Sequence, residues 1–485
     1  MYYRYKLLKD HMEEECGVFG IYNNDGLEVG ELSYFGLYAL QHRGQESAGI
    51  SVSDGTRTRY HKNLGLVADV FDLNKLESLN EGHIAIGHVR YSTTGASEYT
   101  NSQPLVIKYK KGTIALAHNG SLINAQELRK ELEEKGAIFQ TAIDSEIIAN
   151  LIARLGAEEL ENAIQHTMTR IKGSYAITLM TEDKLIGIRD PLGIRPLALA
   201  KLNDSYVLAS ETCAFDAIGA EYIRDVKPGE IIVIDKDGLR SIQTPAPLQS
   251  SLCIFEFVYF ARTDSIIEGI GVSQARKDAG RYLAAEHPVE ADMVIGVPDS
   301  GTTAAIGYAE ASGIPFGEGL LKNRYVGRTF IQPDERMREL GVQIKLNALK
   351  RNVYGKRIVM IDDSIVRGTT SKRIVEMLRL AGAKEVHMRI SSPPVKYPCY
   401  FGMDTPSKNQ LIGATHSVER IRQLIGADSL SYLSLGGLLK TVEGSGCGFC
   451  LGCFNGEYPL DIEDKNKDKI LFQKRELLSK NEKRA

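Results

Sequence analysis

The sequence of 485 residues lacks the features that mark membrane, secreted and nucleic-acid-binding proteins. No apolar run approaches the ~18 residues that a membrane-spanning helix requires. The first fifteen residues, MYYRYKLLKDHMEEE, contain no apolar core and end in glutamates, unlike a secretory signal. The formal net charge is only −3, so electrostatics give no reason to expect nucleic acid or an anionic membrane as a partner.

A disulfide-bonded architecture is not expected either. Seven cysteines in a chain without a secretory signal indicate a reducing compartment, where cysteines serve as metal ligands or nucleophiles. Repeats and low-complexity tracts are missing, and contents of 43% apolar and 25% charged residues are ordinary for a globular protein. We therefore expect a cytoplasmic enzyme, long enough for two or three domains of roughly 100–200 residues each.

One segment, RIVMIDDSIVRGTT at 357–370, combines a strand with a ligand-binding loop. The sequence predicts a buried strand that ends in Asp362 and Asp363, a small hydroxyl-rich loop, and a helix beginning near Ser371. Ligands bind at the carboxyl ends of strands in open α/β sheets, where carboxylates can accept hydrogen bonds from ribose hydroxyls. Backbone N–H groups at the start of the helix can bind a phosphate. The segment contains neither the Rossmann nor the Walker glycine pattern. The alternative is an ordinary strand end with two acidic residues.

A second strand–loop–helix fits the same kind of ligand. Residues 293–298 read as a strand, 299–303 as a tight polar turn and 304–311 as a helix. Small residues such as Ser300 and Gly301 let the backbone approach a diphosphate closely. The sequence thus predicts two phosphate-binding loops in one domain.

A basic stretch at 322–330, which includes Arg324 and Tyr325, lies between these loops. A basic loop alone is usually solvated surface, but this position favours a lid that brings cations over the diphosphate and excludes water. The three segments together resemble the phosphoribosyl pyrophosphate (PRPP) signature of type I phosphoribosyltransferases. The resemblance implies one Mg²⁺ held by Ser300, Asp362 and Asp363. It implies PRPP contacts from Asp362, Asp363, Ser364, Arg367, Gly368, Thr369, Thr370, Ser300, Gly301, Arg324 and Tyr325.

The chain divides into two large parts by its pattern. Residues 16–243 contain many short β-forming runs and two helical patterns, at 125–135 and 145–155, which favours a layered α+β domain. The predicted strands are Ile84 to Tyr91, Thr113 to Ala117, Tyr175 to Met180, Leu185 to Ile188, Tyr206 to Ser210 and Ile231 to Ile234. A proline-containing linker is expected at 244–251.

Beyond the linker, strands and helices alternate from Ile270 to Ile390, as a parallel sheet requires. We expect an α/β domain at 252–463. The lysine-rich end, 464–485, is expected to be a solvated tail.

The first domain carries a distinctive set of motifs around Cys16. A lone cysteine before an apolar strand is usually a core residue. Here Cys16-Gly17-Val18-Phe19-Gly20 is followed by Gln41-His42-Arg43-Gly44, Gly87-His88-Val89-Arg90, His118-Asn119-Gly120 and Asp144-Ser145-Glu146. This set resembles the class II glutamine amidotransferases with an N-terminal nucleophile, whose fold has four layers, αββα.

The resemblance implies a role for each site residue of this domain. Cys16 is the nucleophile, and the Asn119 side-chain amide and the Gly120 N–H form the oxyanion hole. Arg90 pairs with the α-carboxylate of glutamine and Asp144 with its α-ammonium group. Surface ion pairing is the alternative for Arg90 and Asp144.

The chemistry requires Cys16 to be the first residue. Its own α-amine, with a pKa near ~7.7–8.0, then serves as the general base for the thiol. We therefore expect residues 1–15 to be a propeptide removed by self-cleavage at Glu15–Cys16. The alternative is that Met12 or another upstream methionine is the true start.

The remaining cysteines indicate a metal site. Cys447, Cys450 and Cys453 form two overlapping C-x-x-C pairs, and Cys253 and Cys399 lie far away in sequence. A single C-x-x-C pair fits redox, zinc or iron–sulfur roles, whereas a run of three favours metal. The spacing alone does not choose between Cys447 and Cys453, and Cys213 reads as a core residue.

Taken together, the two domains resemble the glutamine PRPP amidotransferases of the iron–sulfur type with a propeptide. That family implies one [4Fe–4S] cluster per subunit, held by Cys253, Cys399, Cys450 and Cys453, with tetrahedral zinc as the competing occupant. It also implies one Mg²⁺ per subunit and feedback inhibition by AMP, GMP, ADP and GDP. The implied assembly is a homo-oligomer, commonly a tetramer.

The expected reaction converts PRPP, glutamine and water into 5-phosphoribosylamine, glutamate and pyrophosphate, the first step of purine nucleotide synthesis. Ammonia is expected to travel inside the protein, because free ammonia would be protonated in water. Two alternatives stay open at this point. One is a different class II amidotransferase, and the other is a regulator that senses PRPP without catalysis.

Overall fold

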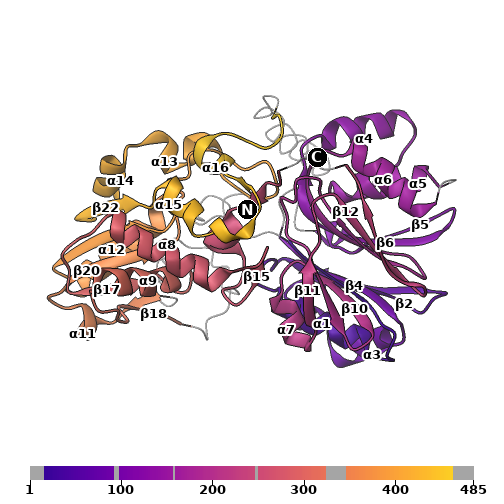
Figure 1. Ribbon diagram of the computed structural model, residues 1–485, viewed down its shortest axis with the longest axis horizontal. Helices are drawn as coiled ribbons and strands as arrows, with labels where there is room; N and C mark the ends of the chain where they lie inside the picture. The colour runs from indigo at the N-terminus through magenta and orange to yellow at the C-terminus, as the bar shows by residue number, and fades with distance from the viewer. Residues whose placement is uncertain (1–15, 92–97, 157–158, 246–248, 324–345, 463–485) are drawn as a thin grey trace, which may run out of the picture.

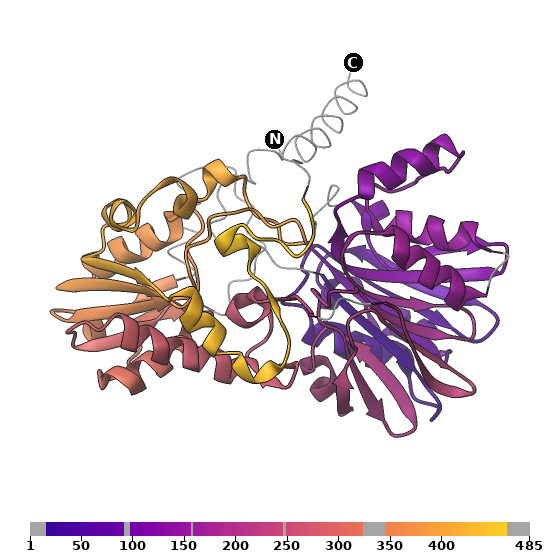
Figure 2. The same ribbon diagram turned by 45° about the horizontal axis from the view of Figure 1, so that its top comes forward.

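The computed structural model describes residues 16–91, 98–156, 159–245, 249–323 and 346–462. These residues form two lobes side by side, one antiparallel and one with a parallel sheet (Figures 1 and 2). None of the helices within the described residues is long and apolar enough to cross a membrane.

The first lobe contains two stacked antiparallel sheets. One sheet has the order β11-β9-β10-β1-β4-β2-β3 and the other β13-β12-β8-β7-β6-β5. The strands of the first are β1 (Gly17–Tyr22), β2 (Ser47–Ser53), β3 (Thr58–Leu64), β4 (Ile84–Arg90), β9 (Ala198–Leu202), β10 (Ser205–Ala209) and β11 (Glu221–Asp225). Those of the second are β5 (Leu105–Tyr109), β6 (Gly112–Leu122), β7 (Gly173–Met180), β8 (Leu185–Arg189), β12 (Glu230–Asp235) and β13 (Gly238–Gln243).

Helices cover both outer faces of this sandwich (Figure 1). One face carries α1 (Val29–Ala39), α2 (Val67–Val70), α3 (Leu73–Asn80) and α7 (Cys213–Ile218), and the other α4 (Ala125–Glu134), α5 (Ser145–Arg154) and α6 (Leu160–Arg170). Between the sheets lies an apolar layer that includes Val18, Ile86, Ala117 and Ile232. Alternate residues of each strand therefore face either this layer or a helical layer. The result is the expected four-layer αββα domain.

The second lobe is built on a parallel sheet of order β17-β20-β21-β22. Its strands are β17 (Met293–Gly296), β20 (Arg357–Asp362), β21 (Glu385–Ile390) and β22 (Ser429–Tyr432). The helices α8 (Val272–Glu286) and α9 (Thr302–Ser312) cover one face, and α12 (Thr369–Leu380) and α14 (Val418–Ile425) the other. Val359 and Ile361 face the first pair of helices, and Ile358 and Met360 the second. Burial on both faces explains why β20 is a continuous apolar run rather than an alternating one.

Short elements complete the second lobe. They are β14 (Leu252–Cys253), a π-helical turn (Glu256–Phe260), β15 (Ile266–Ile267), β16 (Ile270–Gly271), β18 (Leu320–Lys322), β19 (Leu346–Ala348), α11 (Lys350–Val353), α13 (Ile412–Thr415), α15 (Leu435–Lys440), β23 (Phe449–Cys450) and α16 (Gly452–Asn455). Single-turn 3₁₀ helices lie at Tyr99–Asn101, Lys408–Gln410 and Glu443–Ser445.

The element predictions are confirmed in type and need correction in extent. The strand expected at 113–117 continues as β6 to Leu122, because its pairing with β7 runs on through polar residues. Helices α1, α2, α3, α6 and α7 were not predicted, so two helical patterns were too few for the first domain. The helix expected near Ser371 begins at Thr369, directly after Gly368, whose φ is +83°. The linker residues 246–248, the segment 1–15 and the tail beyond Ile462 lie outside the described residues.

Candidate active sites

The end of β1 and the end of β4 bring the thiol and the arginine of the first site together. The two strands are antiparallel, with Gly17 opposite Val89. Cys16 is buried, and its Sγ donates to the carbonyl oxygen of Tyr91 at 3.4 Å. The neighbouring Arg90 is only 2% exposed. Two motifs that are far apart in sequence therefore meet at one end of the sheet.

Asn119 and Gly120 lie inside β6, opposite Ala176 and Tyr175 of β7. The Asn119 side chain is fully buried, and neither its Nδ2 nor its Oδ1 has a hydrogen-bond partner among the described residues. A buried amide without a partner is costly, so it is a donor available to a bound ligand. Gly120 has a φ of +147°, and a Cβ there would lie 2.1 Å from the carbonyl oxygen of Ser174. Only glycine fits this position.

Asp144 directly precedes α5 and faces the same strand. Its Oδ2 accepts a hydrogen bond from the Leu122 N–H at 2.9 Å, and its Oδ1 lies 3.6 Å from His118 Nδ1. Burial raises the pKa of Asp144, but His118 and the Leu122 N–H outweigh burial and hold the pKa below its usual value. The carboxylate is therefore ionised at neutral pH, as a partner for an ammonium group must be.

Two histidines and an arginine of these motifs form contacts that could not be predicted from the sequence. His88 Nε2 lies 3.1 Å from the His118 carbonyl oxygen and joins β4 to β6 across the two sheets. Burial lowers the pKa of His88 to about 3, so this ring is neutral. Arg43 Nε donates to the Cys16 carbonyl oxygen at 3.2 Å. In the sequence, the only feature that pointed to a role for Arg43 was its position in the Gln41-His42-Arg43-Gly44 motif.

The second candidate site lies where β17 and β20 end. The two strands are neighbours, with Gly296 opposite Ile361, so the loops that follow them share one edge of the sheet. Ser300 Oγ lies 3.5 Å from Asp362 Oδ1. A Cβ on Gly301 would lie 2.2 Å from the Ile361 carbonyl oxygen, so the first loop packs directly on β20. The structure thus brings both predicted phosphate loops together.

The carboxylates of this site are buried at the strand end. Asp362 and Asp363 are each 1% exposed. Asp363 Oδ2 accepts a hydrogen bond from Ser364 Oγ at 2.6 Å, while its Oδ1 has no partner among the described residues. Residues 364–368 then lead into α12, whose first turn contains Thr369 and Thr370. Arg367 is half-buried in this loop. Arg324 and Tyr325 lie outside the described residues.

The cysteines expected to bind a cluster come from three segments that meet in one apolar cluster of the second lobe. Cys253 and Cys450 are partners in the parallel pair β14–β23. The Cys453 carbonyl oxygen accepts hydrogen bonds from the N–H groups of Lys396 and Tyr397, next to Cys399. Burial raises the pKa of Cys450 to about 12 and also raises the pKa of Cys453, and Cys399 contributes to both shifts. These thiols therefore lie within electrostatic reach of one another.

Cys447 has different neighbours. Its Sγ donates to Ser445 Oγ at 3.3 Å, and the charged side chains that affect its pKa are Glu268 and Arg189. Among the described residues, no three His, Cys, Asp or Glu side chains lie close enough to bind one metal ion. A [4Fe–4S] cluster takes one thiolate per iron, so its ligands stand farther apart than those of a single zinc ion. The donor set fits the cluster in chemistry and burial.

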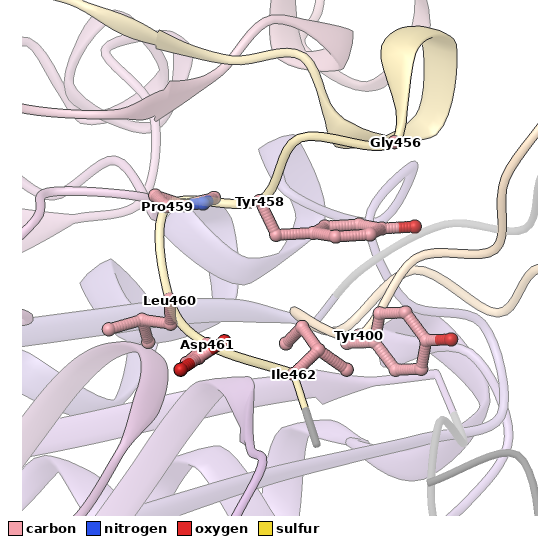
Figure 3. Close-up of a pocket in the computed structure, with 7 residues that line it drawn as sticks. All are labelled: Tyr400, Gly456, Tyr458, Pro459, Leu460, Asp461 and Ile462. Carbon is pink, nitrogen blue, oxygen red and sulfur yellow. The ribbon is translucent and has the colours of Figure 1, made fainter. Parts of the chain in front are cut away.

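Two tyrosines cover the cysteine segments. Tyr400 and Tyr458 line a cavity of about 410 Å³ together with Gly456, Pro459, Leu460, Asp461 and Ile462. Figure 3 shows these seven residues. The rings meet edge to face at 5.2 Å, and Tyr458 Oη donates to the Pro398 carbonyl oxygen at 2.6 Å. Burial raises the pKa of Tyr458, and the nearby thiols raise it further. Aromatic cover of this kind keeps water from buried sulfur atoms.

Comparison with known proteins agrees with this architecture. A family model described as a glutamine amidotransferase domain matches residues 88–217. An amidophosphoribosyltransferase of Bacillus subtilis (strain 168) is 53% identical over 456 residues, which are 93% of this chain and 95% of that protein. A solved glutamine PRPP amidotransferase from B. subtilis, complexed with ADP and GMP, is 52% identical with a TM-score of 0.87 and covers 93% of this chain and 98% of its own.

A second solved structure, described as the allosteric regulatory enzyme of purine biosynthesis, is 52% identical with a TM-score of 0.88 and covers 93% of this chain and 97% of its own. The fold is thus a class II glutamine amidotransferase domain followed by a phosphoribosyltransferase domain. The chain belongs to the amidophosphoribosyltransferase family, the glutamine PRPP amidotransferases of purine biosynthesis. This membership sets aside other class II amidotransferases and non-catalytic PRPP sensors.

Proposed function

We propose that this amidophosphoribosyltransferase releases ammonia from glutamine at Cys16 and passes it internally to PRPP bound at Asp362 and Asp363. The products are 5-phosphoribosylamine, glutamate and pyrophosphate, in the first committed step of purine synthesis. One observation carries the division of labour. The buried Asn119 amide, which has no hydrogen-bond partner among the described residues, and the Asp362–Ser300 contact belong to different lobes, so each half-reaction has its own site.

In the glutaminase half, the α-amine of a terminal Cys16 takes the thiol proton, and the thiolate attacks the side-chain amide of glutamine. The Asn119 Nδ2 and the Gly120 N–H stabilise the oxyanion. The C–N bond then breaks, ammonia leaves with the transferred proton, and water hydrolyses the thioester. Arg90 and Asp144 hold the α-carboxylate and the α-ammonium group of the substrate. This scheme requires residues 1–15 to be removed as a propeptide.

In the phosphoribosyl half, Asp362 and Asp363 accept hydrogen bonds from the ribose hydroxyls. The N–H groups of the 364–370 loop bind the 5-phosphate at the start of α12. The loop at Ser300 and Gly301 approaches the diphosphate, and Arg324 and Tyr325, which lie outside the described residues, are proposed to contact PRPP as well. Mg²⁺ would be held by Asp362, Asp363, Ser300 and the substrate, and would neutralise the diphosphate charge. The C1–O bond to pyrophosphate breaks, and ammonia forms the C1–N bond with loss of a proton.

The four cysteines Cys253, Cys399, Cys450 and Cys453 are proposed to hold one [4Fe–4S] cluster per subunit. The neighbours of Cys447 favour leaving it as the spare thiol. The cluster would tie β14, the 396–403 segment and the 447–456 segment together, a structural rather than catalytic task.

Regulation and assembly are proposed from relatives. The B. subtilis structure is complexed with ADP and GMP. We extend this to binding of AMP, GMP, ADP and GDP by the present chain as feedback inhibitors. A homotetramer in the cytoplasm, with domains at 16–243 and 252–463, completes the proposal.

Two measurements on the purified protein test these assignments. Intact mass spectrometry should give a chain that begins at Cys16, and the visible absorption spectrum with iron and sulfide analysis should give one [4Fe–4S] cluster. A mass that retains residues 1–15 in fully glutamine-active enzyme contradicts the nucleophile assignment. Zinc without iron in anaerobically prepared protein contradicts the cluster.

A further inference from the structure

A fully buried group of charges lies at the junction of the two domains and has no task in the proposed chemistry. The side chains of Arg43, Arg195, Glu211 and Glu256 have no exposed surface. The first three come from the glutaminase domain, and Glu256 begins the π-helical turn of the following domain. Two positive and two negative charges face each other there. Buried charges of this kind are sensitive to the loss of any one partner.

Glu256 forms a bidentate ion pair with Arg43. Arg43 Nη1 donates to Glu256 Oε2 at 2.9 Å, and Nη2 donates to Oε1 at 2.9 Å. Nη1 also donates to Glu211 Oε1. The Nε of Arg43 donates to the Cys16 carbonyl oxygen at 3.2 Å. Because the guanidinium is planar, fixing two of its nitrogens on Glu256 also fixes the donor aimed at the nucleophile residue.

Glu256 also faces Arg195, which leads to the oxyanion strand. Arg195 Nη1 lies 3.7 Å from Glu256 Oε1, and Arg195 Nη2 donates to the Phe401 carbonyl oxygen. The same carbonyl accepts a hydrogen bond from Ser174 Oγ at 2.7 Å, on the strand paired with Gly120. At Gly402, a Cβ would lie 2.9 Å from Arg195 Nη2 and 3.3 Å from the Gly120 carbonyl carbon. The Phe401–Gly402 backbone thus packs directly against the oxyanion residue.

We propose that Glu256, a residue outside the glutaminase domain, is a positioning residue for the glutaminase reaction. One carboxylate holds Arg43 against the Cys16 carbonyl and Arg195 against the backbone that packs on Gly120. The nucleophile and the oxyanion donor come from different sheets, and Glu256 ties both to the phosphoribosyltransferase domain. The inference rests on the proposed roles of Cys16 and Gly120. It predicts that glutamine chemistry depends on a carboxylate that touches neither glutamine nor PRPP.

The test compares Glu256→Gln with Glu268→Gln in the full-length enzyme. Glu268 also forms an ion pair between the two domains at 2.7 Å, but its partner is Arg189 at the end of β8 rather than Arg43 or Arg195. Glutamine hydrolysis, the ammonia-dependent reaction, the melting temperature and the rate of Cys16 alkylation by a diazoketone analogue of glutamine are measured for both. Glu256→Gln should lower kcat for glutamine by about 10- to 100-fold, because a small misplacement of reacting groups has effects of this size.

The KM for glutamine should stay within about twofold, since Arg90 and Asp144 are not displaced. Alkylation of Cys16 should slow in parallel with kcat, while the ammonia-dependent rate is kept. Glu268→Gln should lower the melting temperature without these kinetic effects. Equal kinetic losses in the two variants, or equal losses of glutamine- and ammonia-dependent rates in Glu256→Gln, would overturn the inference.

A second variant, Glu256→Asp, keeps the charge and withdraws the carboxylate by one methylene. We expect this variant to fold and to show a reduced kcat for glutamine. If the folded variant has the kcat of the wild type, the inference is also overturned. The variant Cys16→Ala distinguishes a failure of the proposed function from a failure of the proposed role of Glu256. If Cys16→Ala retains glutaminase activity, the proposed function itself fails. If it is inactive but both Glu256 variants match the wild type, only the role of Glu256 fails.

Discussion

The two candidate sites are built in opposite ways. The glutaminase residues lie on or directly beside paired strands: Cys16 before β1, Arg90 on β4, and Asn119 and Gly120 inside β6. The PRPP residues lie mainly on loops that follow β17 and β20, at one edge of an open parallel sheet. The first set is fixed by strand register, whereas the second is fixed by where strands end.

This difference suits the two reactions. Attack of a thiolate on an amide needs a few atoms held in fixed positions, which a hydrogen-bonded ladder provides. Binding of a large, highly charged substrate needs many backbone N–H groups around it, which loops and a helix N-terminus provide. The comparison predicts that substitutions separate the two activities cleanly and that small backbone changes act differently in each site.

The largest expected effect is the complete loss of activity with glutamine as the nitrogen source. Cys16→Ala should abolish glutamine-dependent activity, because the proposed nucleophile of the glutaminase half-reaction is removed. The ammonia-dependent reaction should persist, since its residues lie in the other lobe. Steady-state assays with glutamine or ammonia as the nitrogen source measure this. Loss of both activities in well-folded protein contradicts the separation of the sites.

The reverse separation is expected for the carboxylates of the second site. Asp363→Asn, or Asp362→Asn, should reduce formation of phosphoribosylamine from either nitrogen source by about 100-fold or more, because a proposed hydrogen-bond acceptor for the ribose hydroxyls is lost. Basal glutaminase activity should survive. Unchanged kcat/KM for PRPP in both variants would show that the ribose contacts are elsewhere.

The predictions from sequence agree best with the structure where all residues of an element are adjacent in the chain. The strand that ends at Asp362 and the turn at Ser300 were predicted because apolar runs and small residues stand next to each other in the chain. The extension of β6 through Asn119 and Gly120 was not, because that part of the strand is polar and is held by pairing with β7. α1 was missed because it contains Gly30 and Gly36 and exposes Phe35 and Tyr38, which blurs its helical pattern.

Contacts between distant segments could not be read from the chain. Arg43, Arg195 and Glu256 are charged residues whose complete burial depends on one another, and composition places such residues at the surface. The proximity of Cys253 to Cys450 likewise depends on a two-residue strand pair. The spacing of Cys447, Cys450 and Cys453 could not indicate which of them are cluster ligands. Their neighbours in the structure differ and favour Cys450 and Cys453.

The proposed cluster should act as a structural link among three segments of the second domain rather than as part of either active site. Cys450→Ser should remove iron and lower the yield of soluble protein, since one missing ligand destabilises a cluster that joins three segments. Cys447→Ser is the matched control in the same loop and should retain iron and activity. Elemental analysis and absorption spectra of both variants decide this. Iron loss in Cys447→Ser with retention in Cys453→Ser would exchange their assignments.

A smaller effect is expected from the tight packing of the first phosphate loop. In Gly301→Ala the new methyl group would lie 2.2 Å from the Ile361 carbonyl oxygen, so the loop must move away from β20. The KM for PRPP should rise by about tenfold, whereas the KM for glutamine in basal hydrolysis should not change. Gly313→Ala is the control for stability, because its surroundings are open although its φ of +73° favours glycine. Equal PRPP kinetics in Gly301→Ala and wild type would show that this loop does not contact the diphosphate.

The smallest expected effect concerns Lys62, a half-buried residue that supports the strand-based site. Lys62 Nζ donates to the carbonyl oxygens of Ser102 at 2.6 Å and Pro104 at 3.2 Å, on either side of Gln103, whose side chain holds the His118 N–H. Burial lowers the pKa of Lys62 from 10.5 to about 8. Between these values the unfolded chain binds a proton that the folded protein does not, so this group makes the free energy of unfolding rise with pH.

Lys62→Met should remove that rise while keeping the length of the side chain. Urea unfolding of wild type and variant at about pH 7.5 and about pH 9.5 should show the wild type gaining stability relative to the variant, by on the order of 2 kcal/mol. Loss of the two hydrogen bonds contributes an offset that does not depend on pH, so the change in the difference is the informative quantity. Parallel pH dependences for the two proteins would mean that Lys62 stays protonated throughout.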